Sequence, residues 1–189
     1  MAPSLDPDRR RLLARLDAYL GRYPDEQAAS DRIRGLVEAH ERCFHRDCFP
    51  GHITGSAWIV NRAATHALLT HHRKLGRWLQ LGGHSDGEGD TRSVAQREGQ
   101  EESGLRLELL DAAIFDIDVH DIPARGNEPA HEHHDLRFLF RADTESSFVV
   151  SEESHDLAWV PMEQLEDYTD EWSVLRLAHK FLNQRSKLV

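Results

Sequence analysis

The most informative stretch of this chain is GGHSDGEGDTRSVAQREGQEESGL, residues 82–105. A glycine-rich loop leads into a helix predicted over residues 90–102, which Asp90 caps and Ser103-Gly104 ends. Glu98, Glu101 and Glu102 are spaced three and four positions apart, so their carboxylates share one helix face and repel one another. Such an oxygen-rich cluster suits Mg²⁺ or Mn²⁺, which also recruit phosphate oxygens as ligands. On spacing alone, a solvated acidic helix face explains the pattern as well.

The same stretch resembles the Nudix box, whose pattern is G-x5-E-x7-R-E-U-x-E-E-x-G-U, with U a bulky aliphatic residue. The matching positions are Gly83, Arg97, Glu98, Glu101, Glu102, Gly104 and Leu105. Gly89 departs from the pattern because it stands where the first glutamate is expected. The nearby acidic residues are Asp86, Glu88 and Asp90. We therefore expect Arg97, which pairs with that glutamate in the family, to pair with one of these shifted carboxylates.

A second departure is Gly99, which stands where the pattern has an aliphatic residue. Glycine inside a helix costs roughly 1 kcal/mol relative to alanine. We expect tight packing of the helix against a strand at this position. Neither departure changes the glutamates that match the family's metal ligands.

The resemblance covers about residues 50–180 in the order of predicted elements, and it implies the Nudix fold, an α/β/α sandwich around a mixed β-sheet. It also implies a metal-dependent hydrolase that cleaves a diphosphate linked to another moiety, usually a nucleoside. Glu98 and Glu102, with the backbone carbonyl of Gly82, would hold Mg²⁺ or Mn²⁺, and Glu101 would bind metal or activate water. A noncatalytic Nudix domain that binds a nucleotide or a protein is the alternative, which the intact glutamates disfavour.

Two further groups are candidates for the catalytic base and for substrate binding. Some family members take the base from a late loop, and Glu152 and Glu153 lie in a comparable loop here, so Glu153 is a candidate beside Glu101. Arg73, Lys74 and Arg77 precede the box and are candidates to bind substrate phosphates. A polar loop tip and a solvated basic turn are the structural alternatives. The tryptophans that could stack a base, although strand aromatics usually belong to the core, are Trp58, Trp78 and Trp159.

The chain contains 13 histidines, the side chain that most often binds metals. A related branch of the fold is isopentenyl-diphosphate isomerase. It binds its metal through two histidines spaced as His45 and His52 are, through a histidine at the position of His84, and through acidic ligands that would fall near His133 and Asp135. The resemblance therefore implies a possible second divalent metal at His45, His52, His84, His133 and Asp135. Gly82 stands where the isomerase has its catalytic cysteine, which disfavours isomerisation. Histidines that hydrogen-bond within loops, or that contact substrate phosphates, are the alternative.

Outside the box, a helical hairpin is predicted from helices over residues 7–20 and 25–42. We expect residues 1–45 to form an N-terminal helical extension and residues 46–189 to form the hydrolase domain. The extension is interpreted as a cap on the domain or as a dimerisation element, which would make the chain a homodimer. Strands are predicted over 53–60, 65–72, 77–83, 105–110, 112–119, 136–141, 148–150 and 157–160, a polar loop over 122–134, and a final helix over 172–183.

Length and charge bound the class of protein. The 189 residues fit one domain with a short appendage, and the net charge of −10 disfavours nonspecific binding to nucleic-acid polymers or anionic membranes. No stretch approaches the roughly 18 apolar residues of a membrane span, and the first residues lack the apolar core of a secretion signal. We expect a cytoplasmic protein with reduced Cys43 and Cys48, acting on a small-molecule diphosphate.

Overall fold

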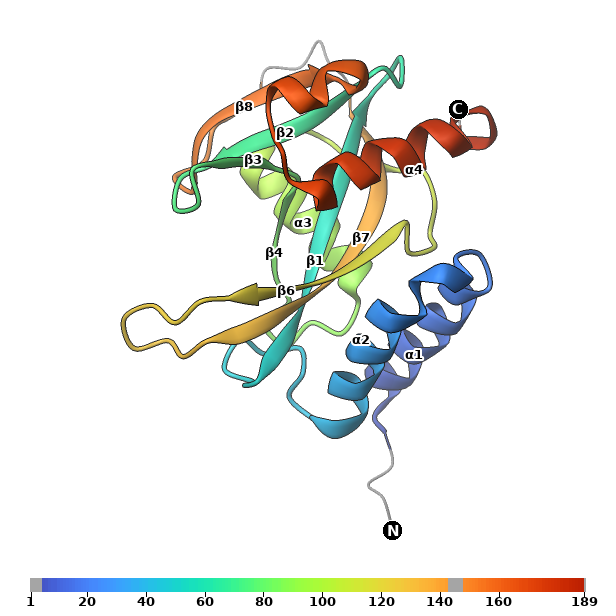
Figure 1. The fold of residues 1–189 in the computed structure, drawn as a ribbon, viewed down its shortest axis with the longest axis vertical. Helices are drawn as coiled ribbons and strands as arrows, with labels where there is room; N and C mark the ends of the chain where they lie inside the picture. The colour runs from blue at the N-terminus through green and yellow to red at the C-terminus, as the bar shows by residue number, and fades with distance from the viewer. Residues whose placement is uncertain (1–4, 143–147, 189) are drawn as a thin grey trace.

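The computed structural model describes residues 5–142 and 148–188 (Figure 1). It contains four α-helices, two short 3-10 helices and eight strands within these ranges. Their bounds are α1 (Pro7–Leu20), η1 (Pro24–Glu26), α2 (Gln27–Ala39), β1 (Gly51–Asn61), β2 (His66–His72), β3 (Arg77–Leu79), β4 (Leu81–His84), α3 (Thr91–Ser103), β5 (Glu108–Leu109), β6 (Asp116–Ile122), β7 (His131–Ala142), β8 (Ser154–Pro161), η2 (Met162–Asp167) and α4 (Trp172–Leu188).

All the strands belong to one open, mixed sheet. Strands β1 and β7 lie at its centre and pair in parallel from Gly51 opposite Glu132 to Asn61 opposite Ala142. All the remaining strand pairs are antiparallel. Strands β2 and β4 pair with β1, strands β5 and β6 pair with β7, and strands β3 and β8 pair with β2. The predicted mixed sheet is confirmed.

The central strands alternate between two hydrophobic cores, because successive side chains of a strand point to opposite faces. Ala57 and Ile59 of β1 pack in a cluster that contains side chains of α1, α2 and α3. Trp58 and Val60 pack in a second cluster that contains side chains of η2 and α4. Figure 1 shows α3 and α4 on opposite sides of the sheet. The predicted α/β/α sandwich is therefore confirmed.

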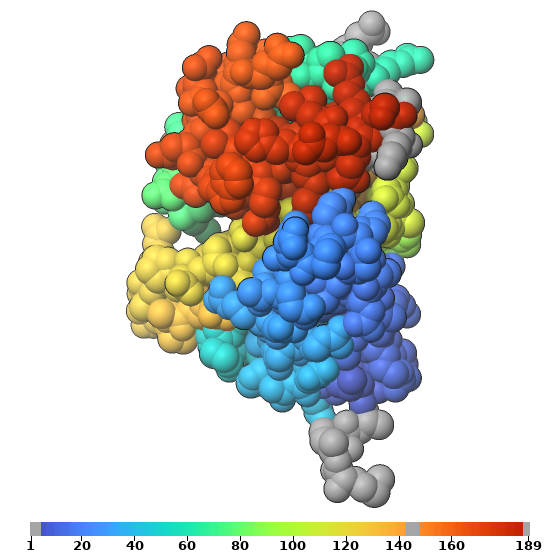
Figure 2. All heavy atoms as spheres, turned by 45° about the vertical axis from the view of Figure 1, so that its right-hand side comes forward, coloured from blue at the N-terminus to red at the C-terminus, as the bar shows by residue number. Residues whose placement is uncertain are grey.

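The N-terminal hairpin forms as predicted and packs on this sandwich. The carboxylate of Asp6 accepts hydrogen bonds from the backbone N–H groups of Asp8 and Arg9, which caps α1. Buried residues of the hairpin share one hydrophobic cluster with Ile53 and Phe138 of the sheet. Figure 2 shows the hairpin, in blue, against the C-terminal part of the chain, in red. The domain division at residue 45, the homodimer and the cytoplasmic location stay predictions.

Several predicted elements have different bounds in the structure. The strand predicted over 77–83 forms two strands, β3 and β4, and the strand predicted over 112–119 begins at Asp116. Helix α2 ends at Ala39, because His40 takes an extended conformation. The strand predicted over 105–110 is reduced to Glu108–Leu109. Residues 148–150 form no strand; instead, the N–H of Val149 donates to the carbonyl of Ser103 at the end of α3 over 2.7 Å.

The polar loop predicted over 122–134 is also shorter than expected. Strand β6 continues to Ile122, and β7 already begins at His131. Polar composition suggested a loop, but β1 and β6 lie on the two sides of β7 and supply hydrogen-bonding partners for its backbone. The prediction for residues 131–134 was therefore wrong, and their side chains belong to a central strand.

Gly99 packs as tightly as the sequence suggested. A Cβ atom at this position would lie 2.8 Å from Cδ1 of Leu107 and 3.0 Å from Cβ of Ala57. The second contact is with a side chain that cannot rotate away. Glycine therefore allows α3 to approach β1 closely, and this approach places the glutamates of α3 beside β4.

Restoring the aliphatic residue of the box pattern is expected to destabilise the protein. Gly99→Leu overfills the contact between α3 and β1 and should lower the free energy of unfolding by about 1–3 kcal/mol, measured by urea denaturation. Gly35→Leu is the matched control, because Gly35 lies in α2 with nothing within 4 Å of a built Cβ. That control should be neutral or stabilising by up to about 1 kcal/mol. Equal stability changes in the two variants would contradict the packing argument.

Candidate active site

The site begins with two carboxylates of α3 that lie against the glycines of β4. Glu102 is buried, and its Oε1 accepts a hydrogen bond from the backbone N–H of Gly82 over 3.0 Å. A side chain at Gly83 would collide with the carboxylate of Glu98, so glycine at that position leaves room for it. Glu101, one residue before Glu102, is exposed. The three carboxylates therefore differ in exposure: Glu102 is buried, Glu98 is partly buried and Glu101 is exposed to solvent.

Burial gives this cluster unusual electrostatics. The pKa of Glu102 is raised to about 8, chiefly by burial and also by the charges of Glu98 and Glu153, against the lowering effect of the Gly82 N–H. Burial likewise raises the pKa of Glu98. A divalent cation would favour the ionised form of both groups, and a set of carboxylate and carbonyl oxygens suits Mg²⁺ or Mn²⁺. The carboxylates of Glu98 and Glu102 thus fit the ion that the resemblance implied, and the Gly82 carbonyl stays a predicted ligand.

Arg97 connects the helix to the loop before it. Its Nη1 lies 2.6 Å from Oε1 of Glu98 and 3.4 Å from Oε2 of Glu101, and its Nη2 donates to the carbonyl of His84 over 3.2 Å. Its Nε also lies 3.8 Å from a carboxylate oxygen of Glu88. The predicted pairing with a shifted carboxylate is therefore found at Glu88, the residue before Gly89.

The other two acidic residues of the loop have different partners. Asp86 pairs with Arg46 over 2.6 Å, and Asp90 pairs with Arg15 of α1 over 2.8 Å. Gly89 lies against the Asp8 side chain of α1, so any larger residue there would overlap with it. The N-terminal hairpin thus occupies the space that a glutamate at position 89 would need, which explains this departure from the pattern.

The model of the NUDIX domain family matches residues 52–180 of this chain. The chain belongs to the Nudix family. The prediction of a Nudix hydrolase is thereby confirmed, and enzymes of this family act on small molecules. No curated protein sequence matches the chain.

Solved structures show the same fold at low sequence identity. A *Caenorhabditis elegans* Ap4A hydrolase binary complex has a TM-score of 0.57 at 18% identity, covering 71% of this chain and 98% of that one. A NUDIX hydrolase from *Clostridium perfringens* has a TM-score of 0.56 at 23% identity, with 70% and 96% covered. The *Escherichia coli* dihydroneopterin triphosphate pyrophosphohydrolase has a TM-score of 0.55 at 16% identity, with 68% and 93% covered.

The turn before β8 brings Glu153 toward the Nudix box. The charge of Glu153 contributes to the raised pKa of both Glu98 and Glu102, so its carboxylate acts on the buried glutamates. The backbone carbonyl of Glu153 accepts a hydrogen bond from the N–H of Arg73 over 2.9 Å. The turn with the predicted basic residues therefore lies beside the turn with the candidate base.

The three predicted basic residues have different surroundings. The Arg73 guanidinium donates to the carbonyl of Ser154 over 2.9 Å, and the Lys74 side chain is exposed. Arg77 pairs with Glu171, so its charge is already neutralised. Arg73 and Lys74 are thus the better placed of the three to meet an anionic substrate. Trp58 is fully buried in the second core, whereas Trp78 stacks on His71 at 5.1 Å between ring centroids.

The structure brings together only part of the predicted histidine site. The rings of His52 and His84 lie 5.1 Å apart, and those of His84 and His133 also lie 5.1 Å apart. His45 instead lies against Gly87 in the loop of the Nudix box. Asp135 is engaged in hydrogen bonds with Thr54 and Ser56.

One histidine that the sequence did not single out completes this cluster. His131 lies with His52 and His133, and these three residues offer ligand atoms that all lie within 4.8 Å of one another. The available signal was the alternation of His131 and His133, which places both side chains on one face if the segment is a strand. Because the segment was expected to be a loop, that signal was missed.

Burial keeps two histidines of this cluster, His52 and His133, uncharged. The pKa of His52 is lowered to about 4, chiefly by burial and also by the neighbouring His84 and His131. Burial also lowers the pKa of His133 far below its ordinary value, with His52 the next largest cause. The imidazoles of His52 and His133 are therefore neutral near neutral pH.

Proposed function

We propose that this Nudix hydrolase cleaves the diphosphate linkage of a small nucleoside-diphosphate-type metabolite with the help of Mg²⁺ or Mn²⁺. The observation that carries the proposal is the buried Glu102, hydrogen-bonded to Gly82 and accompanied by Glu98 on the same helix face. Two of the similar structures, an Ap4A hydrolase and a dihydroneopterin triphosphate pyrophosphohydrolase, have names that fit this class of reaction.

The residues of the site divide the chemistry between them. Glu98, Glu102 and the carbonyl of Gly82 would hold the metal. The bound ion would place positive charge against the diphosphate oxygens and polarise the phosphorus. Arg97 orients Glu98 and Glu101 through its guanidinium. Arg73 and Lys74 are the proposed ligands of a substrate phosphate, with Arg77 as a third candidate once it leaves Glu171.

The proton of the attacking water has two candidate acceptors. Glu101 is exposed on α3, and Glu153 approaches the cluster from the turn before β8. Removing a general base typically lowers kcat by about 10²–10⁴-fold. Of Glu101→Gln and Glu153→Gln, the variant that shows this loss and also loses the fall of kcat at low pH, where a general base becomes protonated, identifies the base. If neither variant loses activity, both assignments are wrong.

A metal-dependent substrate screen tests the proposed activity. Wild-type protein is incubated with nucleoside diphosphate derivatives and Mg²⁺ or Mn²⁺, and the phosphate-containing products are measured with and without EDTA. Product release that requires the metal supports the proposal. A protein that binds a nucleotide but releases no product from any derivative would be the noncatalytic binding domain instead.

A further inference from the structure

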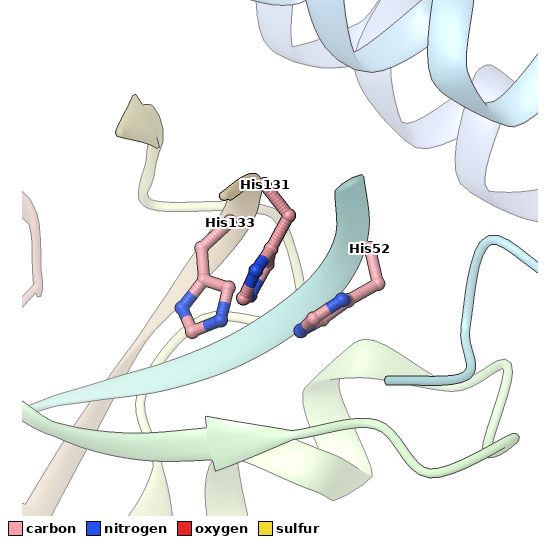
Figure 3. A group of neighbouring side chains, drawn as sticks. All are labelled: His52, His131 and His133. Carbon is pink, nitrogen blue, oxygen red and sulfur yellow. The ribbon is translucent and has the colours of Figure 1, made fainter. Parts of the chain in front are cut away.

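Three histidines from two central strands lie close together, with their rings facing one another (Figure 3). His52 of β1 lies directly opposite His133 in the parallel register with β7, and His131 precedes His133 by two residues on the same face. The ring of His52 lies 4.9 Å from that of His131 and 4.7 Å from that of His133, measured between centroids. The two longest, most extensively paired strands of the sheet therefore fix all three positions.

Four ring nitrogens of these histidines are buried without hydrogen-bonding partners. Both nitrogens of His52, Nε2 of His131 and Nε2 of His133 are in this state among the described residues. Leaving a buried polar atom unpaired costs about 1–3 kcal/mol. Several such atoms at one place therefore indicate a binding partner that satisfies them together.

His131 is already oriented as a ligand. Its Nδ1 lies 2.9 Å from the backbone carbonyl of Pro129, which can only accept, so Nδ1 carries the proton and donates. Its Nε2 then carries the lone pair and lies among the other two rings. Metal-binding histidines are typically fixed by such a hydrogen bond from the other ring nitrogen.

The spacing requires only a small contraction to hold an ion. Ligand nitrogens about 2.0–2.1 Å from a tetrahedral Zn²⁺ lie roughly 3.3 Å apart. The ligand atoms here lie within 4.8 Å of one another, so ring rotations that shorten these separations by up to about 1.5 Å suffice. Two groups stand near the fourth position: Oε1 of Glu128, 3.8 Å from Nε2 of His131, and the ring of His84.

We infer that His52, His131 and His133 form a binding site for a transition-metal ion of the Zn²⁺ type, with Glu128 or His84 near the fourth position. Neutral imidazoles suit Zn²⁺ and its neighbours in the transition series, whereas Mg²⁺ prefers oxygen ligands. The site shares no ligand with the one proposed for Mg²⁺ or Mn²⁺, and it does not depend on the proposed hydrolysis.

The test uses the full chain, stripped with a chelator and reloaded with Zn²⁺ alone. Stoichiometry is measured by elemental analysis and the dissociation constant by competition with a chromophoric chelator. We expect one Zn²⁺ per chain that persists in the Glu98→Gln/Glu102→Gln double variant. His131→Gln and His133→Gln should each weaken Zn²⁺ binding by about 100-fold or more. The matched control is His179→Gln, on the exposed face of α4, which should bind as the wild type does.

Two outcomes would overturn the inference: a wild type that binds no Zn²⁺, or binding that survives both histidine substitutions and is lost in the double glutamate variant. Variants are compared by circular dichroism in the absence of metal to establish that they fold. A second experiment uses the wild-type protein alone and so does not depend on the folding of any variant. X-ray absorption of the Zn²⁺-loaded protein should show the scattering pattern of imidazole ligands, and a shell of oxygen ligands alone would equally refute the site.

Discussion

Replacing Glu102 with glutamine is expected to lower kcat for diphosphate hydrolysis by roughly 10³-fold, because a lost metal ligand removes several kcal/mol of transition-state stabilisation. Glutamine has the shape of glutamate, and its Oε1 can still accept the hydrogen bond that Gly82 donates to Glu102. The substitution also removes a buried carboxylate from a cluster of like charges, so the fold should keep its stability. The measurement is steady-state kinetics at saturating Mg²⁺ on a substrate found in the screen.

The matched control for this loss is Glu163→Gln, the same substitution at an exposed position of η2. It should leave kcat within about twofold of the wild type, since it touches neither the box nor the turn before β8. A fully active Glu102→Gln protein would contradict the assignment of this glutamate as a metal ligand. A loss of activity accompanied by a lower thermal midpoint would instead indicate damage to the fold.

The sequence was sufficient for the local parts of the site. The spacing of Glu98, Glu101 and Glu102 requires only a helix, and the resemblance to the Nudix box supplied the rest of the pattern. The close packing at Gly99 could be predicted because a glycine inside a helix costs helix propensity, and a close approach to another element is the usual compensation. Element type and local spacing are the properties that a sequence pattern carries most directly.

The parts that the sequence missed depend on contacts between distant segments. The reason for Gly89 lies in α1, because the Asp8 side chain of that helix fills the space that the expected glutamate would need. His131 was missed because its strand is polar and owes its conformation to β1 and β6 rather than to its own composition. Pairing between distant strands overrides local propensity, so a polar segment can lie at the centre of a sheet.

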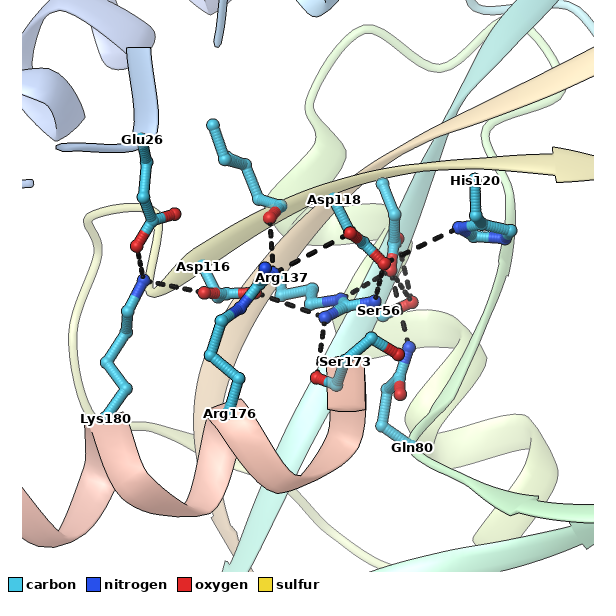
Figure 4. A network of polar contacts seen from close by, with 12 residues as sticks. Glu26, Ser56, Gln80, Asp116, Asp118, His120, Arg137, Ser173, Arg176 and Lys180 are labelled. Carbon is cyan, nitrogen blue, oxygen red and sulfur yellow. Dashed lines mark hydrogen bonds and ion pairs between the residues drawn. The ribbon is translucent and has the colours of Figure 1, made fainter. Parts of the chain in front are cut away.

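A buried network of charged side chains is the clearest example of contacts between distant segments (Figure 4). Arg137 of β7 is fully buried and contacts three carboxylates, Asp135 at 2.8 Å, Asp116 at 3.1 Å and Asp118 at 2.8 Å. Its Nη1 also donates to the carbonyl of Ser173, at the start of α4, over 3.0 Å. Asp116, Asp118 and Ser173 lie far from Arg137 along the chain, so no local pattern predicts these contacts.

The network also joins the N-terminal hairpin to the C-terminal helix. Nζ of Lys180 in α4 lies 2.6 Å from oxygen atoms of Tyr19, Glu26 and Asp116. Arg176, one turn earlier in α4, donates to Asp116 over 2.6 Å. Asp116 therefore has three cationic partners, whereas Arg137 is the one cation that the described residues place against Asp135.

Replacing Arg137 with methionine is expected to lower the free energy of unfolding by about 3 kcal/mol, the lower end of the 3–5 kcal/mol typical of a broken buried ion pair. Methionine fills much of the same volume but leaves the buried Asp135 without a cation, with only the hydroxyls of Thr54 and Ser56 and the amide of Gln80 to solvate it. Asp116 keeps its ion pairs with Arg176 and Lys180, so we do not expect a loss of stability at the upper end of that range. Urea denaturation followed by circular dichroism measures the change.

Arg141→Met is the matched control, since it makes the same substitution four residues further along β7. Arg141 pairs with Glu108 over 2.8 Å, but Glu108 is largely solvent-exposed, and such surface pairs contribute about 0–1 kcal/mol. A stability loss in Arg137→Met no larger than in Arg141→Met would show that the buried network does not stabilise the fold. Adding Asp135→Asn to Arg137→Met should recover part of the lost stability, because the double variant no longer buries an unpaired charge; failure of this rescue would place the cost in packing instead.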